Sequence, residues 1–371
     1  MAGTAASADP KGPGGHVATR VLVIGAGGGA ANNLVASLQS VLPGFTAVGA
    51  HSDPFILRKS IAERNYLLSP AAEDAGEIAS IVAHEAIDLV IPSSEADVKR
   101  LSDHRDALAG RLFLPPKTVV DTCHDKCDLA AFLARHDVPV PVSFPVISLQ
   151  ALDGVFEKLA WSPRVWCRVR SGTGSLGAAP VTTAAQARGW MEHWEALRDV
   201  APTSFMLAEY LPGRDFFCQS LWNAGRLVLV KTCERLSYFG GENSPSGVSS
   251  LYSLAKTVVD NRVVDVSLRA LRALDPAPTG TFSVDLKENA DGVPCVTEIN
   301  AGRLVMGMTT IGSIGAHNMP ACYVRVALGE AVAFEDAYDC PPDYYIVRDL
   351  DTPSGIFHAD DIMDHFLQID V

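Results

Sequence analysis

Residues Gly280–Asn300 read GTFSVDLKENADGVPCVTEIN, and this stretch carries the most information about the fold. Apolar and polar residues alternate from Phe282 to Leu286, a pattern typical of a strand with one apolar and one polar face. The dipeptide Asp291-Gly292 is typical of a two-residue turn between antiparallel strands. The stretch therefore predicts a β-hairpin.

The polar face of this hairpin predicts a metal site. With the two-residue turn, or with a longer symmetric loop, Asp285 faces Glu298 and Ser283 faces Asn300. Opposed side chains lie about 4.5–5.5 Å apart at Cβ, and like charges there destabilise a sheet. Two carboxylates and an amide oxygen suit Mg²⁺, which prefers oxygen ligands and is held partly by phosphates. A solvated acidic face is the alternative.

A second stretch, Val165–Val181, reads VWCRVRSGTGSLGAAPV and predicts an anion site. Arg168 and Arg170 stand one residue apart on a predicted strand, and the glycine-rich loop Ser171–Gly177 follows at once. Fixed positive charge beside accessible backbone N–H groups favours an anion with several oxygens, such as a phosphate. The alternative is a hairpin turn with surface arginines.

Composition limits the classes of protein to consider. The chain has 371 residues, and at about 100–200 residues per domain this predicts two or three domains. Hydrophobic residues make up 48%, enough for a large core. The net charge of −13 argues against nucleic acid or an anionic membrane as partner, because no basic field would recruit them. No segment reads as a secretory signal or a membrane span.

The eight cysteines show no paired spacing. Cys123, His124 and Cys127 form a short cluster, but no second pair follows at the distance of a zinc finger. Reduced thiols in a cytoplasmic protein are therefore the preferred interpretation.

The first part of the chain alternates strand and helix patterns after a tail, residues 1–18, that we expect to be flexible. The patterns predict strands at Arg20–Ile24, Thr46–Gly49 and Asp88–Ile91, and a helix at Ala30–Val41. Such alternation predicts a parallel α/β sheet.

The later part of the chain has a different pattern. Asp121–His136 reads as one helix, with apolar residues at helical spacing. From Pro145 onward, strand-like runs separated by short turns or helices predict an antiparallel α+β domain. The Gly- and Ser-rich run Ser237–Ser250 predicts a loop long enough to act as a lid.

Glycines after the first strand raise the alternative of a dinucleotide site. Gly25, Gly27 and Gly29 follow that strand, and Asp53 follows the next, where an acid could hold a ribose. Their spacing is not G-x-G-x-x-G, so we do not expect NAD binding.

Taken in order, the motifs resemble those of the ATP-grasp superfamily. They are an α/β domain, a helix bearing Lys126, the Arg168 strand with its glycine-rich loop, the run AEYLPGRDF and the hairpin ending in EIN. The chain looks most similar to carbamoyl phosphate synthetase large chains, biotin carboxylases and carboxylate–amine ligases. The resemblance covers about Arg20–Glu330, and its specificity lies in the whole set of motifs.

The resemblance implies an N-terminal pre-ATP-grasp α/β domain with a parallel sheet, then a two-part α+β ATP-grasp domain with antiparallel sheets. The implied boundaries are 19–117 for the first domain, 118–205 for the small ATP-grasp subdomain, 206–334 for the large subdomain with the metal hairpin, and 335–371 for a C-terminal extension.

The resemblance also implies roles for individual residues. The residues implied to contact ATP phosphates are Lys126, Arg168, Ser171, Gly172, Gly174 and Ser175. Those implied to hold adenine and ribose are Glu209, Tyr210, Leu211 and Asp215, and those implied to bind Mg²⁺ are Asp285, Glu298 and Asn300. Position 168 is normally lysine in these enzymes, but carbamoyl phosphate synthetases use arginine there, which offers phosphate a bidentate fork.

Three basic residues complete the implied catalytic set. Many relatives read EINPR, whereas this chain reads EINAGR, which places Arg303 one residue later. We still expect Arg303 to face phosphate or a substrate carboxylate. Lys231 and Arg235 lie where relatives place basic active-site residues, and solvated charges on a strand edge are an equal alternative for both.

The function implied by the resemblance is that of an ATP-dependent ligase. It would activate a carboxylate as an acyl phosphate, join it to an amine or similar nucleophile, and release ADP and phosphate. Its partners would be small-molecule carboxylates and amines, with a homodimer as one allowed assembly. Two alternatives stay open: a bicarbonate-activating enzyme like carbamoyl phosphate synthetase, and an ATP-binding module without turnover.

Overall fold

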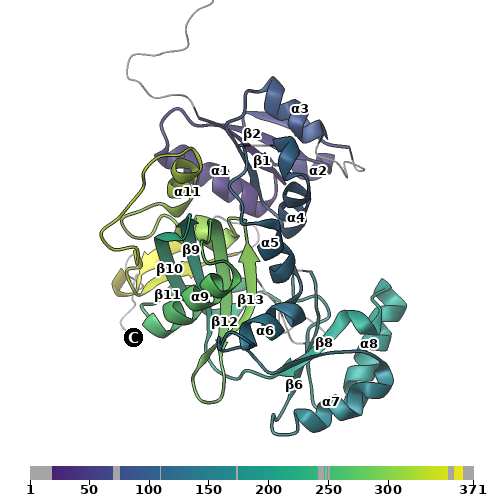
Figure 1. Cartoon of the computed structure of the whole chain (residues 1–371). Helices are drawn as coiled ribbons and strands as arrows, with labels where there is room; N and C mark the ends of the chain where they lie inside the picture. The colour runs from purple at the N-terminus through teal and green to yellow at the C-terminus, as the bar shows by residue number, and fades with distance from the viewer. Residues whose placement is uncertain are drawn as a thin grey trace, which may run out of the picture.

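The structure is a computed structural model that describes residues 19–69, 76–108, 110–172, 174–240, 246, 249, 251–349 and 355–361. The predicted tail, residues 1–18, lies outside the described residues, as does most of the second half of the predicted lid. The described residues form three sheets with helices packed around them (Figure 1).

The N-terminal sheet is parallel, with strand order β3-β2-β1-β4. Its strands are β1 (Arg20–Ile24), β2 (Thr46–His51), β3 (Arg64–Leu67) and β4 (Leu89–Pro92). Its helices are α1 (Gly29–Val41), α2 (Pro54–Leu57), α3 (Gly76–His84) and α4 (Glu95–Asp103). β1 is apolar at almost every position because helices cover both faces of a parallel sheet. The predicted parallel α/β fold is confirmed.

The segment predicted as one helix, Asp121–His136, is two helices, α5 (Lys117–His124) and α6 (Lys126–Ala134). Asp125 separates them because its backbone is extended and its carboxylate accepts hydrogen bonds from the N–H groups of Cys127 and Asp128. This is the geometry of a helix N-cap, and Asp125 is the single residue between the end of α5 and the start of α6. The prediction of a single helix was wrong.

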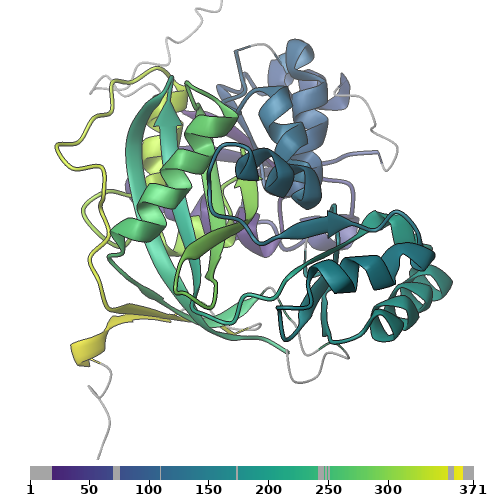
Figure 2. The ribbon, with the colours of Figure 1, turned by 60° about the horizontal axis from the view of Figure 1, so that its bottom comes forward.

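The small sheet is antiparallel, with strand order β5-β8-β6-β7. Its strands are β5 (Ser143–Pro145), β6 (Val165–Val169), β7 (Ala179–Val181) and β8 (Phe205–Glu209), and its helices are α7 (Leu152–Lys158) and α8 (Ala184–Arg198). Both views show these helices at one end of the molecule, set apart from the other two sheets (Figures 1 and 2).

The large sheet is also antiparallel, with order β13-β12-β9-β10-β11-β14-β15. Its strands are β9 (Asp215–Asn223), β10 (Arg226–Tyr238), β11 (Tyr252–Thr257), β12 (Gly280–Glu288), β13 (Pro294–Ala301), β14 (Tyr344–Val347) and β15 (Gly355–His358). The accompanying helices are α9 (Asn261–Leu274), α10 (Met306–Ile311) and α11 (Met319–Ala327), and short 3₁₀ turns lie at Arg105–Leu108, Leu149–Ala151, Pro202–Ser204 and Ala359–Asp361. Two strands of the predicted C-terminal extension thus belong to this sheet. The predicted domain boundaries themselves stay predictions.

The predicted hairpin is β12 and β13, and its register is confirmed at the positions that matter. Asp285 pairs with Glu298, and Ser283 pairs with Asn300. The prediction of a two-residue turn at Asp291-Gly292 was wrong, because residues 289–293 form a longer loop. A β-bulge just beyond the pair of Asp285 and Glu298 adds one residue to β13. Because of this extra residue, Asp285 still lies opposite Glu298 although the loop is longer than predicted.

The two faces of the large sheet have different surroundings. Phe282, Val284 and Leu286 pack in an apolar cluster with residues of α6 and α9. Side chains of the opposite face, including Asp285 and Glu298, are left to form the candidate site because strand residues alternate between faces. The expected division of the hairpin into an apolar and a polar face is confirmed.

A separate apolar cluster joins the N-terminal sheet to the large sheet. It contains Val23 of β1, Leu34 of α1, Leu221 of β9 and Tyr323 of α11. The Tyr323 hydroxyl also donates a hydrogen bond of 3.1 Å to the carbonyl of Phe113. Next to the hairpin, α5 packs against β13 and α4 packs against α5. None of the helices in the described ranges combines the length and apolarity needed to cross a membrane.

Candidate active site

Asp285, Glu298 and Asn300 lie on one face of the hairpin, with both carboxyl side chains about one-fifth exposed. Burial raises the pKa of Asp285, although Arg235 opposes that shift. Burial also disfavours the charged form of Glu298, but Lys126 and Arg168 outweigh it and lower the pKa of that carboxyl. The pKa values of the two opposed carboxyls therefore shift in opposite directions, because their neighbours differ.

The donor set of this face fits a hard cation, because all three residues offer oxygen atoms. It holds only two carboxylates, so the remaining ligands would come from phosphates and water. Within the described ranges, no group of three His, Cys, Asp or Glu side chains could hold a metal ion. The eight cysteines are buried free thiols.

Two cations from different elements meet at Glu298. An Nη2 group of Arg168, on β6, donates a hydrogen bond of 2.9 Å to Glu298 Oε2. The Lys126 ammonium, at the start of α6, lies 3.7 Å from the same oxygen and donates to the carbonyl of Gly172 at 2.6 Å. Lys126 is almost fully buried, and burial lowers its pKa. The structure therefore brings together the two predicted phosphate cations and one predicted metal ligand.

Arg170 has a different environment from Arg168. Its guanidinium contacts the Asp125 carboxylate at 2.9 Å and the Asp128 carboxylate at 2.9 Å. Both acids lie at the N-terminal end of α6, and Arg170 directly follows β6. These ion pairs therefore connect the start of α6 to the end of β6. Of the two arginines in the predicted anion motif, only Arg168 faces the hairpin.

The glycine-rich loop follows β6 directly. Gly172 and Gly174 have φ angles of +111° and +75°, in the left-handed region that favours glycine. Ser175 adopts φ of +56°, which is uncommon for a residue with a side chain. Ser171 completes the predicted phosphate-contacting set, and the Lys126 bond to Gly172 holds the loop near the cations.

The predicted adenine segment lies at the end of β8. Glu209 exchanges hydrogen bonds with Val142: its N–H donates to the Val142 carbonyl at 2.8 Å, and its carboxylate accepts from the Val142 N–H at 3.2 Å. Tyr210 N–H donates to the Ser162 hydroxyl at 3.4 Å, and Leu211 is buried. These contacts fix the backbone that the resemblance assigns to adenine.

Arg235 lies in the site with both of its Nη groups engaged by acids, whereas its Nε–H is buried without a hydrogen-bond partner in the described part of the chain. Its guanidinium donates to Asp285 at 2.6 Å and to Asp215 at 2.9 Å, and it lies over the ring of Phe217. The Tyr238 hydroxyl also donates to Asp215, at 2.5 Å. Arg235 therefore neutralises a predicted metal ligand and the predicted ribose-binding acid, and it is not a spare cation for a substrate.

Lys231 is not a spare cation either. It is about 1% exposed, and its ammonium donates to the Asp339 carboxylate at 2.9 Å and to the carbonyls of Asp339 and Ile314. Asp339 also accepts hydrogen bonds from the N–H groups of Ala316 and His317. The alternative of a solvated strand edge was wrong for Lys231, and the catalytic role implied by the resemblance stays a prediction.

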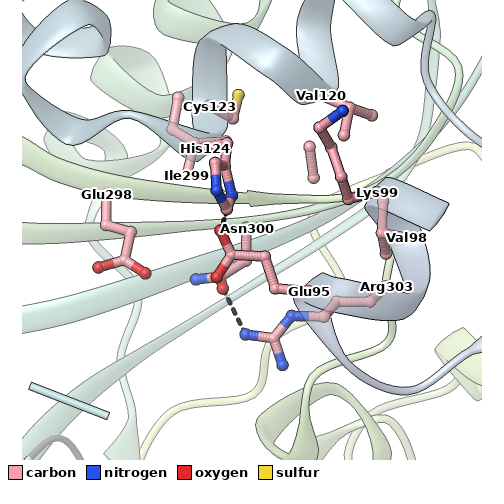
Figure 3. A pocket seen from close by; sticks show the side chains of 11 residues that line it. Glu95, Val98, Lys99, Val120, Cys123, His124, Glu298, Ile299, Asn300 and Arg303 are labelled. Carbon is pink, nitrogen blue, oxygen red and sulfur yellow. Dashed lines mark hydrogen bonds and ion pairs between the residues drawn. The ribbon is translucent and has the colours of Figure 1, made fainter. Parts of the chain in front are cut away.

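Arg303 follows β13 and reaches the hairpin, where its Nη2 group donates to Asn300 Oδ1 at 2.5 Å. Both residues line a pocket between the hairpin and the N-terminal domain (Figure 3). The other residues of this pocket are Glu95, Val98, Lys99, Val120, Cys123, His124, Glu298, Ile299 and Ala301.

Sequence reasoning did not single out Glu95, and it considered His124 only within the short cluster with Cys123 and Cys127. Glu95 Oε1 and His124 Nδ1 lie 2.6 Å apart and share a hydrogen bond in this pocket (Figure 3). Glu95 follows the predicted strand that ends near Pro92, and ligands of parallel sheets gather at such carboxyl ends. The place of Glu95 after this strand could therefore have marked it as a candidate site residue. Nothing in the sequence indicated that His124 would form a hydrogen bond with Glu95.

A second hollow, of about 310 Å³, lies at the carboxyl edge of the N-terminal sheet beside Gly25 and Gly29. Asp53, the acid of the dinucleotide alternative, accepts hydrogen bonds from the N–H groups of Phe55 and Ile56 and so caps α2. These backbone bonds lower the pKa of Asp53. Its carboxylate therefore has a structural role as the N-cap of α2, and NAD binding stays disfavoured by the spacing of the glycines.

No protein-family model matches the sequence, and no curated protein matches it. Solved structures do. An L-amino acid ligase from Bacillus licheniformis is similar with a TM-score of 0.66 at 18% identity, over 88% of this chain and 78% of that one. A biotin carboxylase from Campylobacter jejuni, solved with a β,γ-ATP ligand, gives 0.69 at 12% identity, over 88% and 74% of the two chains.

A third similar structure is N5-carboxyaminoimidazole synthase from Aspergillus clavatus, in complex with ADP and an aminoimidazole ribonucleotide. Its TM-score is 0.65 at 15% identity, over 89% of this chain and 82% of that one. All three are ATP-grasp proteins, and each similarity spans nearly the whole described chain. The protein therefore has the ATP-grasp fold, with an N-terminal α/β domain ahead of it, and the resemblance seen in the sequence is confirmed at the level of fold.

Proposed function

We propose that the protein is an ATP-dependent ligase that activates a carboxylate as an acyl phosphate and joins it to an amine, releasing ADP and phosphate. One observation carries the proposal: Arg168 and Lys126 meet Glu298 at the metal-type hairpin, directly beside the glycine-rich loop. Cations, oxygen ligands and accessible backbone N–H groups in one place are what phosphoryl transfer needs.

In this proposal the phosphates of ATP lie between β6 and the hairpin. Arg168 and Lys126 would neutralise the phosphate oxygens, and the loop of Ser171, Gly172, Gly174 and Ser175 would cover them with its N–H groups. The backbone of Glu209, Tyr210 and Leu211 would hold the adenine, and Asp215 the ribose.

Asp285, Glu298 and Asn300 would hold Mg²⁺. When bound, Mg²⁺ would neutralise charge that develops on the transferred phosphoryl group. Arg235 would keep Asp285 ionised despite its burial, because the guanidinium lies 2.6 Å from that carboxylate. Arg235 is thus a positioning residue in this proposal.

Arg303 is the cation proposed to hold the substrate carboxylate. It lines the pocket beside Asn300, so a carboxylate bound to it would lie close to the proposed phosphate site. Transfer of the γ-phosphoryl group would turn one carboxylate oxygen into a good leaving group, which a nucleophile then displaces. The similar structures support this chemistry, since they include an L-amino acid ligase and a biotin carboxylase solved as a β,γ-ATP complex.

The reaction can be tested before the natural substrates are known. Purified protein with ATP and Mg²⁺ would be screened against pools of carboxylates and amines, with bicarbonate as a separate arm, and ADP and phosphate would be measured. ATP labelled at the β,γ-bridging oxygen should scramble its label when the right carboxylate is present without an amine. Formation of AMP and pyrophosphate would contradict the proposal, because an adenylate requires attack at the α-phosphorus.

A further inference from the structure

Four polar residues form a row across the large sheet that begins at the proposed metal site. Asn300 of β13 pairs with Ser283 of β12. Ser283 also pairs with Gln219 of β9, and Gln219 pairs with Lys231 of β10. Residues that pair directly across neighbouring strands lie on the same face of a sheet, so these four residues, the polar row, share the face of the candidate site.

Gln219 differs from the other members of the polar row. Its side chain is fully buried, and within the described ranges neither its amide oxygen nor its amide nitrogen has a hydrogen-bond partner. The hydroxyl of Thr281, two residues before Ser283 on the same strand, is also buried without a partner there. Buried polar groups are nearly always hydrogen-bonded, and one left without a partner destabilises the folded state. A purely structural role therefore does not explain a glutamine at this position.

The helix α10 covers Gln219 without bonding to it. The backbone of Gly307 lies so close that a Cβ atom there would come within 2.6 Å of the Gln219 amide nitrogen. This helix has six residues and no side-chain hydrogen bond at its N-cap, and so short a helix has little stability of its own. A polar ligand that satisfied the amide could therefore replace the first turn of α10 over Gln219.

The surroundings of Gln219 favour an uncharged ligand group. Lys231, its neighbour on β10, is already neutralised by Asp339 at 2.9 Å, and Ser283 carries no charge. An ion buried beside Gln219 would lack a counter-ion in the polar row, which is strongly unfavourable. A glutamine amide offers N–H donors and a carbonyl acceptor side by side. Its complement is a neutral group that both accepts and donates, namely a carboxamide.

We propose that the carboxylate substrate carries a carboxamide group at its far end, and that Gln219 binds this group. Arg303, proposed above to hold the reacting carboxylate beside Asn300, would contact the other end of the same molecule. Gln219 lies two strand spacings from Asn300, about 10 Å between backbones. With a side chain reaching in from each end, this span suits an acid with about two or three methylene groups between carboxylate and carboxamide. This inference rests on the proposed function and names its substrate class.

The test compares acids that differ only at the end remote from the reacting carboxylate. Succinamate and glutaramate carry the carboxamide. Their partners carry an isopropyl group of similar shape, in 4-methylpentanoate and 5-methylhexanoate, or a second carboxylate, in succinate and glutarate. Hydroxylamine would serve as the nucleophile for every acid, so the product is a hydroxamate and the natural amine is not needed. The measured quantity is the ratio of kcat/KM for each amide to that of its partners.

We expect the wild-type protein to favour the amide over both partners by about ten- to a hundredfold at one chain length at least. The partner acids would leave the buried amide of Gln219 unpaired or would place a charge beside it. Gln219→Met keeps the length of the side chain but removes its polar atoms, so the ratio of amide to isopropyl acid should fall close to one. Gln150→Met, the same change at an exposed position, is the matched control and should keep the wild-type ratio.

A second measurement needs no substrate. Because the Gln219 amide is buried without a partner in the described ranges, Gln219→Met should raise the Tm of the protein by about 2 °C or more. Thr232→Val is the contrast on the neighbouring strand. Thr232 is equally buried, but its hydroxyl donates a hydrogen bond to the carbonyl of Val258, so its loss should lower the Tm. Higher stability together with lost selectivity is the result expected of a residue kept for ligand binding.

Three results would overturn the inference and leave the ligase proposal standing. The first is a wild-type protein that converts the amides no better than their partners, or that converts only acids outside this set. The second is a Gln219→Met variant with the wild-type ratio. The third is a lower Tm for Gln219→Met, which would mean that the amide is hydrogen-bonded in the folded protein and is structural. No ADP release with any acid of this set or of the wider carboxylate pools would contradict the ligase proposal as well.

Discussion

At the scale of single residues, the acids of the hairpin face each have a cation beside them. Glu298 contacts Arg168 and Lys126, and Asp285 contacts Arg235. Buried charges without partners are strongly destabilising, so these pairs allow two opposed carboxylates to share one face of a sheet. Replacing any one of these residues therefore changes both the chemistry and the charge balance.

Glu298→Gln tests the proposed metal site with a substitution of similar shape. We expect it to lower Mg²⁺-dependent ATP turnover by about a hundredfold or more, because the amide is a weak ligand for a hard cation. ADP release measures the effect, with circular dichroism as the check on folding. Glu192→Gln, on the exposed side of α8, is the matched control. Turnover at the wild-type rate in Glu298→Gln would remove this residue from the site.

Arg168→Ala tests the proposed phosphate contact. A hydrogen bond to a charged group contributes about 1.5–3 kcal/mol, and Arg168 must leave Glu298 to make a new one. We therefore expect ATP affinity to fall about tenfold, toward the lower end of that range. Calorimetry would measure the Kd, with Arg188→Ala on α8 as the control. An unchanged Kd would mean that Arg168 only serves the ion pair with Glu298.

Several residue pairings could be predicted from the sequence, and others could not. The facing of Asp285 and Glu298 followed from strand periodicity, which depends on local spacing alone. The bond between Glu95 and His124 depends on how α4 packs against α5, and no local pattern encodes that contact. For the same reason, the sequence did not show that Arg235 and Lys231 would be engaged by acids from other strands and segments.

At the scale of elements, the errors of sequence reasoning occurred where one residue interrupts a regular pattern. Apolar spacing runs through Asp121–His136, yet Asp125 ends one helix and starts the next. The hairpin loop is longer than Asp291-Gly292 predicts, because the Asn289 side chain accepts hydrogen bonds from the N–H groups of Asp291 and Val293. Periodicity identified these elements correctly, whereas side-chain bonds to the backbone decided where they end.

Asp125→Ala should measure how much the cap between α5 and α6 contributes. The variant loses two hydrogen bonds from helix N–H groups and the contact with Arg170. We expect the free energy of unfolding to fall by about 1–2 kcal/mol, as for other N-cap residues. Urea unfolding gives this value, and Asp128→Ala, which keeps the cap, separates the cap from the ion pair. A wild-type midpoint for Asp125→Ala would contradict the assignment.

At the scale of the whole molecule, a buried acid links two strands of the N-terminal sheet, β1 and the edge strand β3. Glu85, just after α3, accepts a hydrogen bond from the Tyr66 hydroxyl and contacts the guanidinium groups of Arg64 and Arg20. These partners, Tyr66 first, hold the pKa of Glu85 at about 2, below its ordinary 4.5. Ionised Glu85 is therefore part of the folded domain throughout the neutral range.

This shift predicts a specific loss of stability in acid. Because the folded pKa lies below the unfolded one, the contribution of Glu85 is complete above about pH 4.5 and is lost as the pH falls toward 2. Thermal unfolding of wild type and Glu85→Gln would be compared between about pH 6 and about pH 3. The wild type should have the higher Tm near pH 6, and the difference should shrink in acid. A constant difference across this range would contradict the prediction.

The contact of Arg168 with Glu298 has a consequence for how ligands act on each other. Arg168 belongs to the small sheet and Glu298 to the large one, so the protein supplies its own counter-ions across the join between two subdomains. A phosphate that takes Arg168 frees Glu298, and a divalent cation that takes Glu298 frees Arg168. Each ligand thus removes a competitor of the other, and their affinities should rise together. Nucleotide and metal would therefore bind cooperatively. The ion pair of Arg168 with Glu298 would be replaced by contacts of Arg168 with phosphate and of Glu298 with the metal ion.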